Sequence, residues 1–408
     1  MKILFVMYDN GGAQNPIPMG PCYVAGYLKD HGYDDITYYS QDIYHYTEHH
    51  LTDYLDTHHY DVLGLGFTAG YYQYAKILRI CEAINRSKDK PFLVLGGYGP
   101  SPLPEFFLEK TEADAVVVGE GEEALLSIVR SLGRGVVEGL PIKDLDSIPF
   151  PYYDPLPMEY YLNQKPFGNM SPTDRTLPMI TSRGCPYSCN FCQKQTHNIR
   201  YRSAQNVAEE LGKYTKDYGV SFSQFWDELF VSSENRTYAL TQAISPFNIH
   251  YWCTARVNTV NKDILAMLKE SGCVYIDYGI EQFDDAALEA MNKKQTEEQI
   301  INAIKMTQEA GIKIGFNIIW GNIGDTRESL HKSMNLLSEY NDYGQLRTIR
   351  PVTPYPGSPL YDLAIERGLL TGPEDFYQKH RNVELLTCNF TDIPDDEFHE
   401  CLYYANYE

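Results

Sequence analysis

The chain has 408 residues, 43% of them apolar, which is more than one ordinary core holds and indicates about two domains. Its 34 basic and 55 acidic residues give a net charge of −21, and such a surface repels phosphate backbones, so we expect no nucleic-acid partner. No apolar run approaches the ~20 residues of a membrane span, and no signal-peptide cleavage pattern follows the apolar start. We therefore expect a cytoplasmic protein without a membrane span.

Residues 1–135 alternate between strand and helix patterns. Strands are expected at 3–7, 36–39, 62–67, 92–95 and 115–118, with helices at 21–30, 47–57, 71–85 and 122–132. This alternation predicts an α/β domain with a doubly wound, Rossmann-like parallel sheet, in which ligands bind at the carboxyl ends of the strands. Glycines follow four of these strands and would let a large flat ligand approach the backbone closely.

Frequent prolines in residues 136–176 favour an extended linker between domains. The alternation then resumes, with strands expected at 178–182, 222–226, 251–255, 275–280, 314–319 and 346–351. Helices are expected near 203–217, 235–244, 261–271, 296–310, 326–340 and 359–367. Six such units predict a partial (β/α)6 barrel of the TIM type at 177–370, with its site at the carboxyl strand ends. Ser203 and Thr296 are good N-cap residues, and Gln299 completes a capping box. Residues 371–408 are acidic, and we expect an irregular C-terminal extension.

Three of the nine cysteines, Cys185, Cys189 and Cys192, lie within eight residues of one another. Zinc is one reading, but a structural zinc site needs four ligands, no second cysteine pair is present, and His197 stands alone. A [4Fe–4S] cluster held by three cysteines keeps one iron without a protein ligand. That open iron can bind a substrate directly, which a closed zinc site cannot.

The spacing Cys-x3-Cys-x2-Cys, with the aromatic Phe191 before the last cysteine, resembles the radical S-adenosylmethionine (SAM) superfamily. Segments 225–228, 255–257, 278–282 and 354–359 are similar to later strand ends of that family. The resemblance implies that the cysteines hold a [4Fe–4S] cluster whose open iron chelates SAM. The positions that it implies for SAM contacts are Phe191, Asp227, Glu228, Arg256, Glu281, Gln282 and Gly321.

Ordinary chemistry supports two of these positions and leaves structural alternatives open. Arg256 suits the carboxylate of SAM, and Glu281 suits the hydroxyls of its ribose. Asp227 and Arg256 could equally serve a loop cap and a structural ion pair. The segment 321–326 differs from the family turn by having Ile323 for proline and Asp325 for glutamate, so we expect a less rigid turn.

The N-terminal segments 96–101 and 114–122 resemble the cobalamin-binding domain that is fused to some radical SAM domains. The contacts that this resemblance implies are Asn10, Thr68, Gly96, Gly97, Tyr98, Gly119, Glu120 and Gly121. The loop at 9–12 has no histidine, and Gly99 stands where the fused family often has one. We therefore expect base-off cobalamin without a histidine ligand, its lower face meeting water or an uncharged side chain such as Tyr98. The alternative is a Rossmann-like domain that binds no cofactor.

The combined resemblance implies an enzyme that cleaves SAM reductively to a 5′-deoxyadenosyl radical and, with cobalamin, methylates an unactivated carbon of a small molecule or peptide. One alternative keeps the cofactors but yields a rearrangement, ring contraction or cyclisation. An alternative of another class is a non-catalytic iron–sulfur or cobalamin sensor. The implied partner is an electron donor such as flavodoxin or ferredoxin, and the sequence names no catalytic acid or base.

Overall fold

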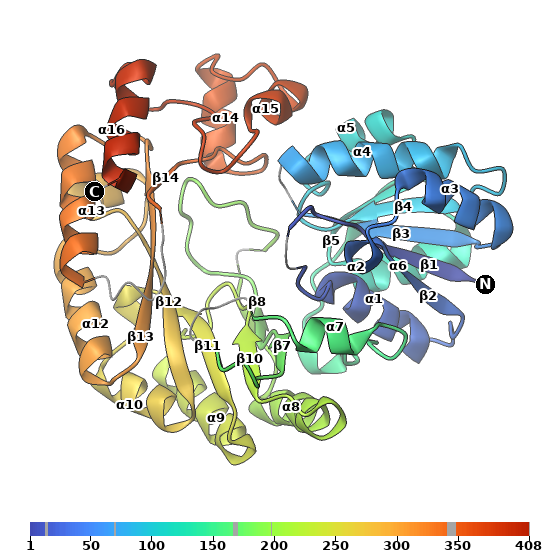
Figure 1. The fold of residues 1–408 in the computed structure, drawn as a ribbon, viewed down its shortest axis with the longest axis horizontal. Helices are drawn as coiled ribbons and strands as arrows, with labels where there is room; N and C mark the ends of the chain where they lie inside the picture. Colours follow the sequence, from blue (N-terminus) through green and yellow to red (C-terminus); the bar gives the residue numbers. More distant parts are fainter. Residues whose placement is uncertain (13–14, 69–70, 166–169, 197, 341–347, 408) are drawn as a thin grey trace. The chain divides into compact units, whose positions relative to one another are not determined.

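The chain forms two compact units in the computed structural model, which describes residues 1–12, 15–68, 71–165, 170–196, 198–340 and 348–407. The first unit comprises Met1–Tyr161 together with Thr371–Asn382. The second comprises Leu162–Leu370 together with Val383–Glu408. Both units are α/β structures built on parallel sheets (Figure 1). The C-terminal part of the chain therefore contributes to both of them.

The first unit is built on a six-stranded parallel sheet in the order β2-β1-β3-β4-β5-β6. The strands are β1 (Ile3–Met7), β2 (Ile36–Ser40), β3 (Val62–Gly66), β4 (Phe92–Gly96), β5 (Ala115–Gly119) and β6 (Gly135–Gly139). The central strands are almost wholly buried, as expected of a sheet covered on both faces. The predicted Rossmann-like sheet is confirmed, and β6 is an edge strand that the sequence did not predict.

Helices connect these strands and pack against one another in pairs. The helices are α1 (Met19–Asp30), α2 (Gln41–Tyr44), α3 (Glu48–Thr57), α4 (Tyr71–Asn85), α5 (Pro104–Thr111), α6 (Gly121–Ser131) and α7 (Met158–Leu162). α1 packs beside α6, whereas α3 packs beside α4 and α4 beside α5. The parallel strands leave all of their carboxyl ends at one edge of the sheet, where the loops after β1, β3, β4 and β5 lie side by side.

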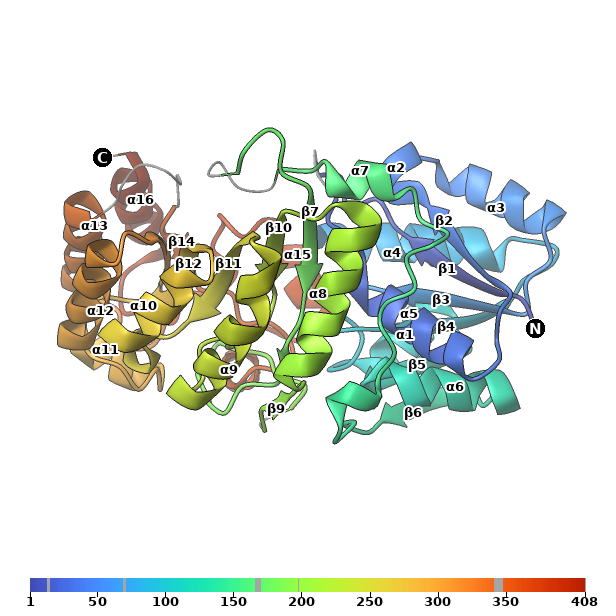
Figure 2. The same ribbon diagram turned by 90° about the horizontal axis from the view of Figure 1, so that it is seen from below.

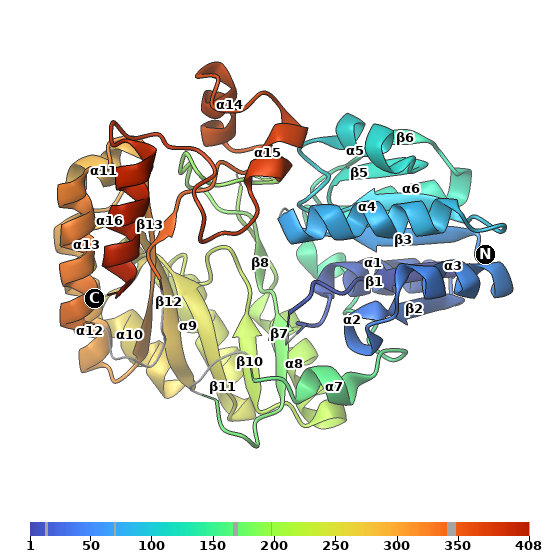
Figure 3. The ribbon, with the colours of Figure 1, turned by 45° about the horizontal axis from the view of Figure 1, so that its top comes forward.

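A segment from far along the chain, residues 371–382, completes the first unit, and we call it the C-terminal strap. It contains α15 (Pro373–Lys379), which lies at the start of α4 (Figure 3). The ring of Tyr377 stacks on that of Tyr74 with centroids 4.1 Å apart. The carboxylate of Glu374 accepts a hydrogen bond from the Tyr74 hydroxyl at 2.9 Å and pairs with Lys110 at 2.8 Å.

The second unit is built on a curved parallel sheet in the order β14-β13-β12-β11-β10-β7. The strands are β7 (Thr176–Met179), β10 (Phe222–Phe225), β11 (His250–Ala255), β12 (Cys273–Glu281), β13 (Lys313–Trp320) and β14 (Arg350–Pro351). The helices around its outer side are α8 (Ala204–Tyr218), α9 (Glu234–Ile244), α10 (Lys262–Glu270), α12 (Glu297–Glu309) and α13 (Arg327–Tyr340) (Figures 1 and 2). The expected partial barrel is confirmed, although the first residues of its sixth expected strand, 346 and 347, lie outside the described residues.

Helix ends follow the sequence signals. Ser203 caps α8 by accepting from the backbone of Asn206, and Thr296 and Gln299 form the predicted capping box of α12. The structure has three more helices: α11 (Asp285–Ala290), α14 (Pro359–Glu366) and α16 (Asp395–Tyr407). Of these, only α14 was predicted. The expectation of an irregular C-terminus is wrong for α16, whose acidic first turn suits a helix start. Among the residues described, every helix is too short or too polar to cross a bilayer.

Candidate functional site

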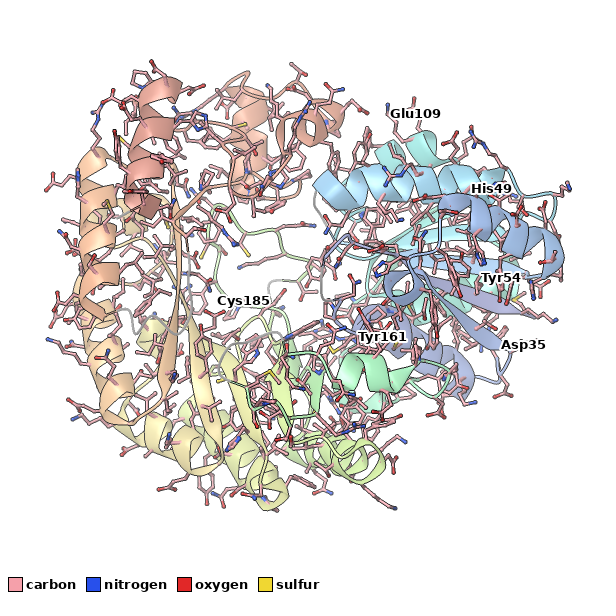
Figure 4. The ribbon with its side chains drawn as sticks, viewed as in Figure 1. Asp35, His49, Tyr54, Glu109, Tyr161 and Cys185 are labelled. Atoms are coloured by element: carbon pink, nitrogen blue, oxygen red, sulfur yellow. The ribbon has the colours of Figure 1, made fainter. Side chains whose placement is uncertain are left out.

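The three clustered cysteines lie on a loop that a short antiparallel ladder closes. β8 (Ser182–Arg183) pairs with β9 (Arg200–Tyr201), so residues 184–199 project as one loop after the first barrel strand. Cys189 is buried, Cys185 is half-buried (labelled in Figure 4) and Cys192 is exposed. Gly184 has φ +91°, and a Cβ there would lie 2.5 Å from the carbonyl oxygen of Asn198, so the neck of the loop requires glycine.

Asn190, between the second and third cysteines, anchors this loop to the barrel. Its backbone N–H donates to the carbonyl of Met291 at 3.0 Å, and its own carbonyl accepts from the N–H of Leu360 at 2.9 Å. Its side-chain amide forms a reciprocal pair with that of Asn322, at 3.1 and 2.8 Å. A further bond runs from the Asn292 amide to the carbonyl of Ser188 at 2.7 Å. The cysteine loop is therefore positioned by the ends of several barrel elements.

Arg256, expected at the carboxylate of SAM, is buried at the carboxyl end of β11 and contacts the cysteine loop. Its guanidinium lies 3.8 Å from the ring centroid of Tyr187, and Nη1 lies 3.8 Å from Sγ of Cys189. Nη2 donates to the carbonyl of Lys293. The structure thus places this cation against a cysteine sulfur, while a contact with SAM stays a prediction.

Asp227 is buried at the carboxyl end of β10, and its carboxylate is already fully used by its neighbours. It accepts from the backbone N–H of Thr181 at 3.0 Å, from the Thr181 hydroxyl at 2.9 Å and from the Ser182 hydroxyl. Burial raises the pKa of this carboxyl, and the same hydrogen bonds oppose that rise. Asp227 therefore fixes the backbone that leads into the cysteine loop, whereas Glu228 beside it is exposed.

Glu281 is the last residue of β12 and has a left-handed conformation, with φ +66°, which is costly for a residue with a side chain. Its carboxylate pairs with the ammonium of Lys293 at 3.0 Å, and both side chains are largely buried. The same ammonium lies 5.8 Å from the ring centroid of Phe191. Lys293 therefore links two predicted SAM positions, because it pairs with Glu281 and lies near the ring of Phe191.

The turn after β13 is held by Asp325, although it lacks the proline and glutamate of the family pattern. The Asp325 carboxylate accepts from the N–H groups of Gly321 at 2.8 Å and Asn322 at 2.9 Å and from the amide of Gln282 at 2.7 Å. The expectation of a less rigid turn thus overlooked this buried carboxylate. Gly321 has φ +100°, and a Cβ there would lie 2.7 Å from the ring of Phe398 on α16, so packing alone explains this glycine.

The cysteine loop supplies three free thiols, the donor type that iron–sulfur clusters use. Among the described residues, no three His, Cys, Asp or Glu side chains converge on a point where one ion would bind. The thiols of Cys185, Cys189 and Cys192 nevertheless interact electrostatically. Three thiolates are the ligand set of a [4Fe–4S] cluster with one open iron, and that this loop holds such a cluster stays a prediction. His197, the single histidine weighed for zinc, lies outside the described residues.

The predicted cobalamin positions gather at the carboxyl edge of the first unit's sheet. Asn10 follows β1, Thr68 follows β3, the residues at 96–98 follow β4, and those at 119–121 follow β5. These strands are consecutive neighbours, so the four loops form one continuous edge. Thr68 and Tyr98 are exposed there, as a ligand contact requires.

Three positions on this edge also have internal roles. The Asn10 side chain accepts from the N–H of Gly12 at 2.8 Å and shapes its own loop. Glu120 is buried, and its carboxylate accepts from the N–H of Ile142 at 2.8 Å. Gly119 has φ +93°, and a Cβ there would lie 2.3 Å from the carbonyl oxygen of Gly139. These contacts explain the three residues without a ligand, and their contact with cobalamin stays a prediction.

Sequence reasoning missed a polar cluster at the ends of β1 and β2. His45 has its Nδ1 2.7 Å from a carboxylate oxygen of Asp9. The buried amides of Asn15 and Gln41 each have an oxygen without a hydrogen-bond partner among the described residues. Buried acceptors of this kind suit a ligand rich in amide N–H groups, such as cobalamin, whose corrin ring carries amide side chains. Spacing gave no signal for this cluster, because the sheet brings its residues together.

Asp42, next to Gln41, is a buried carboxyl in the same cluster. It accepts a hydrogen bond from the Tyr161 hydroxyl at 2.6 Å, and Tyr161 is labelled in Figure 4. The amide of Asn15 donates to the Asp42 carbonyl at 2.7 Å. Burial raises the pKa of Asp42 to about 6, although the bond from Tyr161 opposes the rise. This carboxyl therefore titrates close to neutral pH.

Two family models match the chain, each within one of the two units. The model described as the B12 binding domain matches residues 13–129, and that of the radical SAM superfamily matches residues 179–337. An uncharacterized methyltransferase of Pyrococcus horikoshii is 29% identical over 405 residues, covering 91% of this chain and 84% of that protein. The anaerobic magnesium-protoporphyrin IX monomethyl ester cyclase of Rubrivivax gelatinosus is 26% identical, covering 88% of this chain and 69% of the cyclase.

A solved structure shares the fold over most of this chain. It is the radical S-adenosylmethionine methyltransferase TsrM of Kitasatospora setae, solved with cobalamin and a [4Fe–4S] cluster bound. The TM-score is 0.74 at 15% identity, and the match covers 91% of this chain and 76% of that one. The two family models confirm both resemblances drawn from the sequence motifs. The chain has a B12-binding domain followed by a radical S-adenosylmethionine domain, which is the domain pair of cobalamin-dependent radical S-adenosylmethionine enzymes.

Proposed function

We propose that this enzyme transfers a methyl group to an unactivated carbon of a small molecule or peptide. The observation that carries the proposal is the convergence of the three-cysteine loop with Phe191, Arg256 and Glu281 at one edge of the barrel sheet. The proposed contacts for SAM are these three with Asp227, Glu228, Gln282 and Gly321. The methyltransferase name of the relative from Pyrococcus horikoshii supports the methyl-transfer part.

Cys185, Cys189 and Cys192 would hold the cluster. When bound, the cluster and SAM supply a 5′-deoxyadenosyl radical and cobalamin supplies the methyl group. The barrel residues orient the substrates and keep water away from the reacting atoms. A small electron carrier such as flavodoxin or ferredoxin is the proposed reductant, in keeping with a cytoplasmic location. The sequence and the contacts described above name no acid or base for the reaction.

Cobalamin is proposed to bind base-off over the carboxyl edge of the first sheet, through the loops that carry Asn10, Thr68, Gly96, Gly97, Tyr98, Gly119, Glu120 and Gly121. We propose that its lower face meets water or an uncharged side chain, since the loop after β1 has no histidine. His45 is the residue against which this is tested, because Asp9 holds its Nδ1 and leaves Nε2 for a ligand. Nitrogen hyperfine splitting in the EPR spectrum of bound cob(II)alamin that disappears in H45A would show a histidine ligand to cobalt and overturn this part of the proposal.

The test of the function is an anaerobic reconstitution with iron, sulfide, cobalamin and SAM. Methyl transfer predicts a methylated product together with 5′-deoxyadenosine and S-adenosylhomocysteine. C192A should lose the cluster absorbance and all three products, while C401A, which removes a thiol outside the loop, should retain them. Formation of 5′-deoxyadenosine without S-adenosylhomocysteine contradicts methyl transfer, and the absence of both supports a sensor.

A radical cyclisation without methyl transfer is the second candidate, with rearrangement or ring contraction as variants. The observation that favours it is the similarity to the anaerobic cyclase of Rubrivivax gelatinosus, at 26% identity over 398 residues. Cyclisation predicts 5′-deoxyadenosine and a product of unchanged carbon count. Deuterium-labelled S-adenosylmethionine (methyl-d3) separates the two functions, because only methyl transfer carries label into the product.

A further inference from the structure

Lys194, two residues after the last cysteine, has a buried ammonium group without a visible counter-charge. Its Nζ is inaccessible to solvent, and it has no hydrogen-bond partner among the residues that the structure describes. Lys194 as a residue is half-buried, but its charged group is the part removed from water, and an uncompensated buried charge is costly. The geometry therefore indicates that an anion belongs beside Lys194.

The other charged groups at this edge are already engaged. Arg256 bonds to the Lys293 carbonyl and stacks on Tyr187, and the Lys293 ammonium pairs with Glu281. These groups hold one another and the cysteine loop in place. Lys194 differs from them because, in the part of the chain that the structure describes, its buried ammonium has no hydrogen-bond partner.

Lys194 follows the third cysteine by two residues, and its charge acts on that thiol. Burial raises the pKa of Cys192 to about 11, and the ammonium of Lys194 opposes the rise. Arg256 lies against Sγ of Cys189. One cation thus contacts a sulfur of the loop, and a second lowers the pKa of another.

We infer that Lys194 is the counter-charge of the iron–sulfur cluster and makes the cluster easier to reduce. An oxidised core of charge two plus, bound by three thiolates, carries one net negative charge, and one electron from the reductant makes it two. A fixed positive charge beside it favours the more negative state, which raises the reduction potential. The inference rests on the proposed cluster. Lys194 acts on the cluster through its charge and does not contact the substrate.

The test is an EPR-monitored redox titration of the anaerobically reconstituted, full-length protein without SAM. We expect K194Q to reduce the ratio of reduced to oxidised cluster at a fixed potential by on the order of tenfold, equal to 59 mV for one electron. K194R, which keeps the charge, should titrate like the wild type. K305Q removes an exposed lysine of α12 and should leave the midpoint potential unchanged.

An unchanged midpoint potential in K194Q overturns the inference, even if SAM binds more weakly, because the ammonium would then serve the SAM carboxylate. Equilibrium dialysis of SAM against the oxidised protein measures that second possibility. Should K194Q and K194M both lose iron while K194R retains it, the requirement for charge is supported. Loss of iron from K194R as well contradicts it. The absorbance spectrum of the wild type tests the cluster itself, so failure of the proposed function is distinguishable.

Discussion

Removing the Asp227 carboxylate should loosen the backbone that leads into the cysteine loop. D227A leaves the buried N–H of Thr181 and the hydroxyls of Thr181 and Ser182 without their shared acceptor. One unsatisfied buried N–H costs ~1–3 kcal/mol, and two hydroxyls that must find other acceptors cost ~1 kcal/mol each. The local penalty is therefore about 3–5 kcal/mol.

That penalty corresponds to about a 100-fold to several-thousand-fold increase in local opening. Amide hydrogen exchange read by mass spectrometry over residues 180–202 measures it, and iron content measures its effect on the cluster. D227N keeps the shape and one acceptor oxygen, so it should exchange at an intermediate rate. Its milder effect is expected because burial already raises the pKa of Asp227 and disfavours its charge. Unchanged exchange over 180–202 in D227A would refute the reasoning.

Three further predictions concern other contacts. Burial raises the pKa of Asp42 to about 6, so the folded state holds the proton more tightly than the unfolded state does, and stability falls as pH rises through 6. Urea titrations should show a loss of about 1.4 kcal/mol in the free energy of unfolding between about pH 5 and pH 7.5. D42N, which keeps the bond to Tyr161, should not show this loss. G321A should cost about 2–4 kcal/mol through its backbone and the ring of Phe398, and F398A should relieve part of this cost in a double-mutant thermal series. Y377A removes a fully buried ring, at ~3–5 kcal/mol, and should make the C-terminal strap the first site of limited proteolysis; cleavage elsewhere first would contradict this.

Most of the fold was predictable because its signals are local. The strands of the first sheet are short buried apolar runs, and the capping box at Thr296 begins a helix where expected. β6 was not predicted because Gly135–Gly139 is half exposed, lacks a continuous apolar run and becomes a strand only through pairing with β5. α16 was missed although Phe398 and Leu402, four residues apart, already mark one buried helix face.

The candidate site was predictable in its place but not in its contacts. A parallel sheet brings its carboxyl strand ends together, so residues such as Glu281 could be assigned to one edge from order alone. The engagement of Arg256 with a cysteine sulfur and the burial of Lys194 depend on how the loop after β8 folds back. That folding is set by distant partners of Asn190, which no spacing in the sequence reveals.

The C-terminal strap has a consequence for biosynthesis. The first unit ends its main stretch at Tyr161 but includes Thr371–Asn382, about 200 residues later. At ~5–20 residues per second, a ribosome needs roughly 10–40 s to make that interval. During this time the aromatic surface of Tyr74, Phe106 and Phe107 is not yet covered by Tyr377. The domain that begins first is thus completed only as the end of the chain emerges, which couples its final packing to synthesis of the whole barrel.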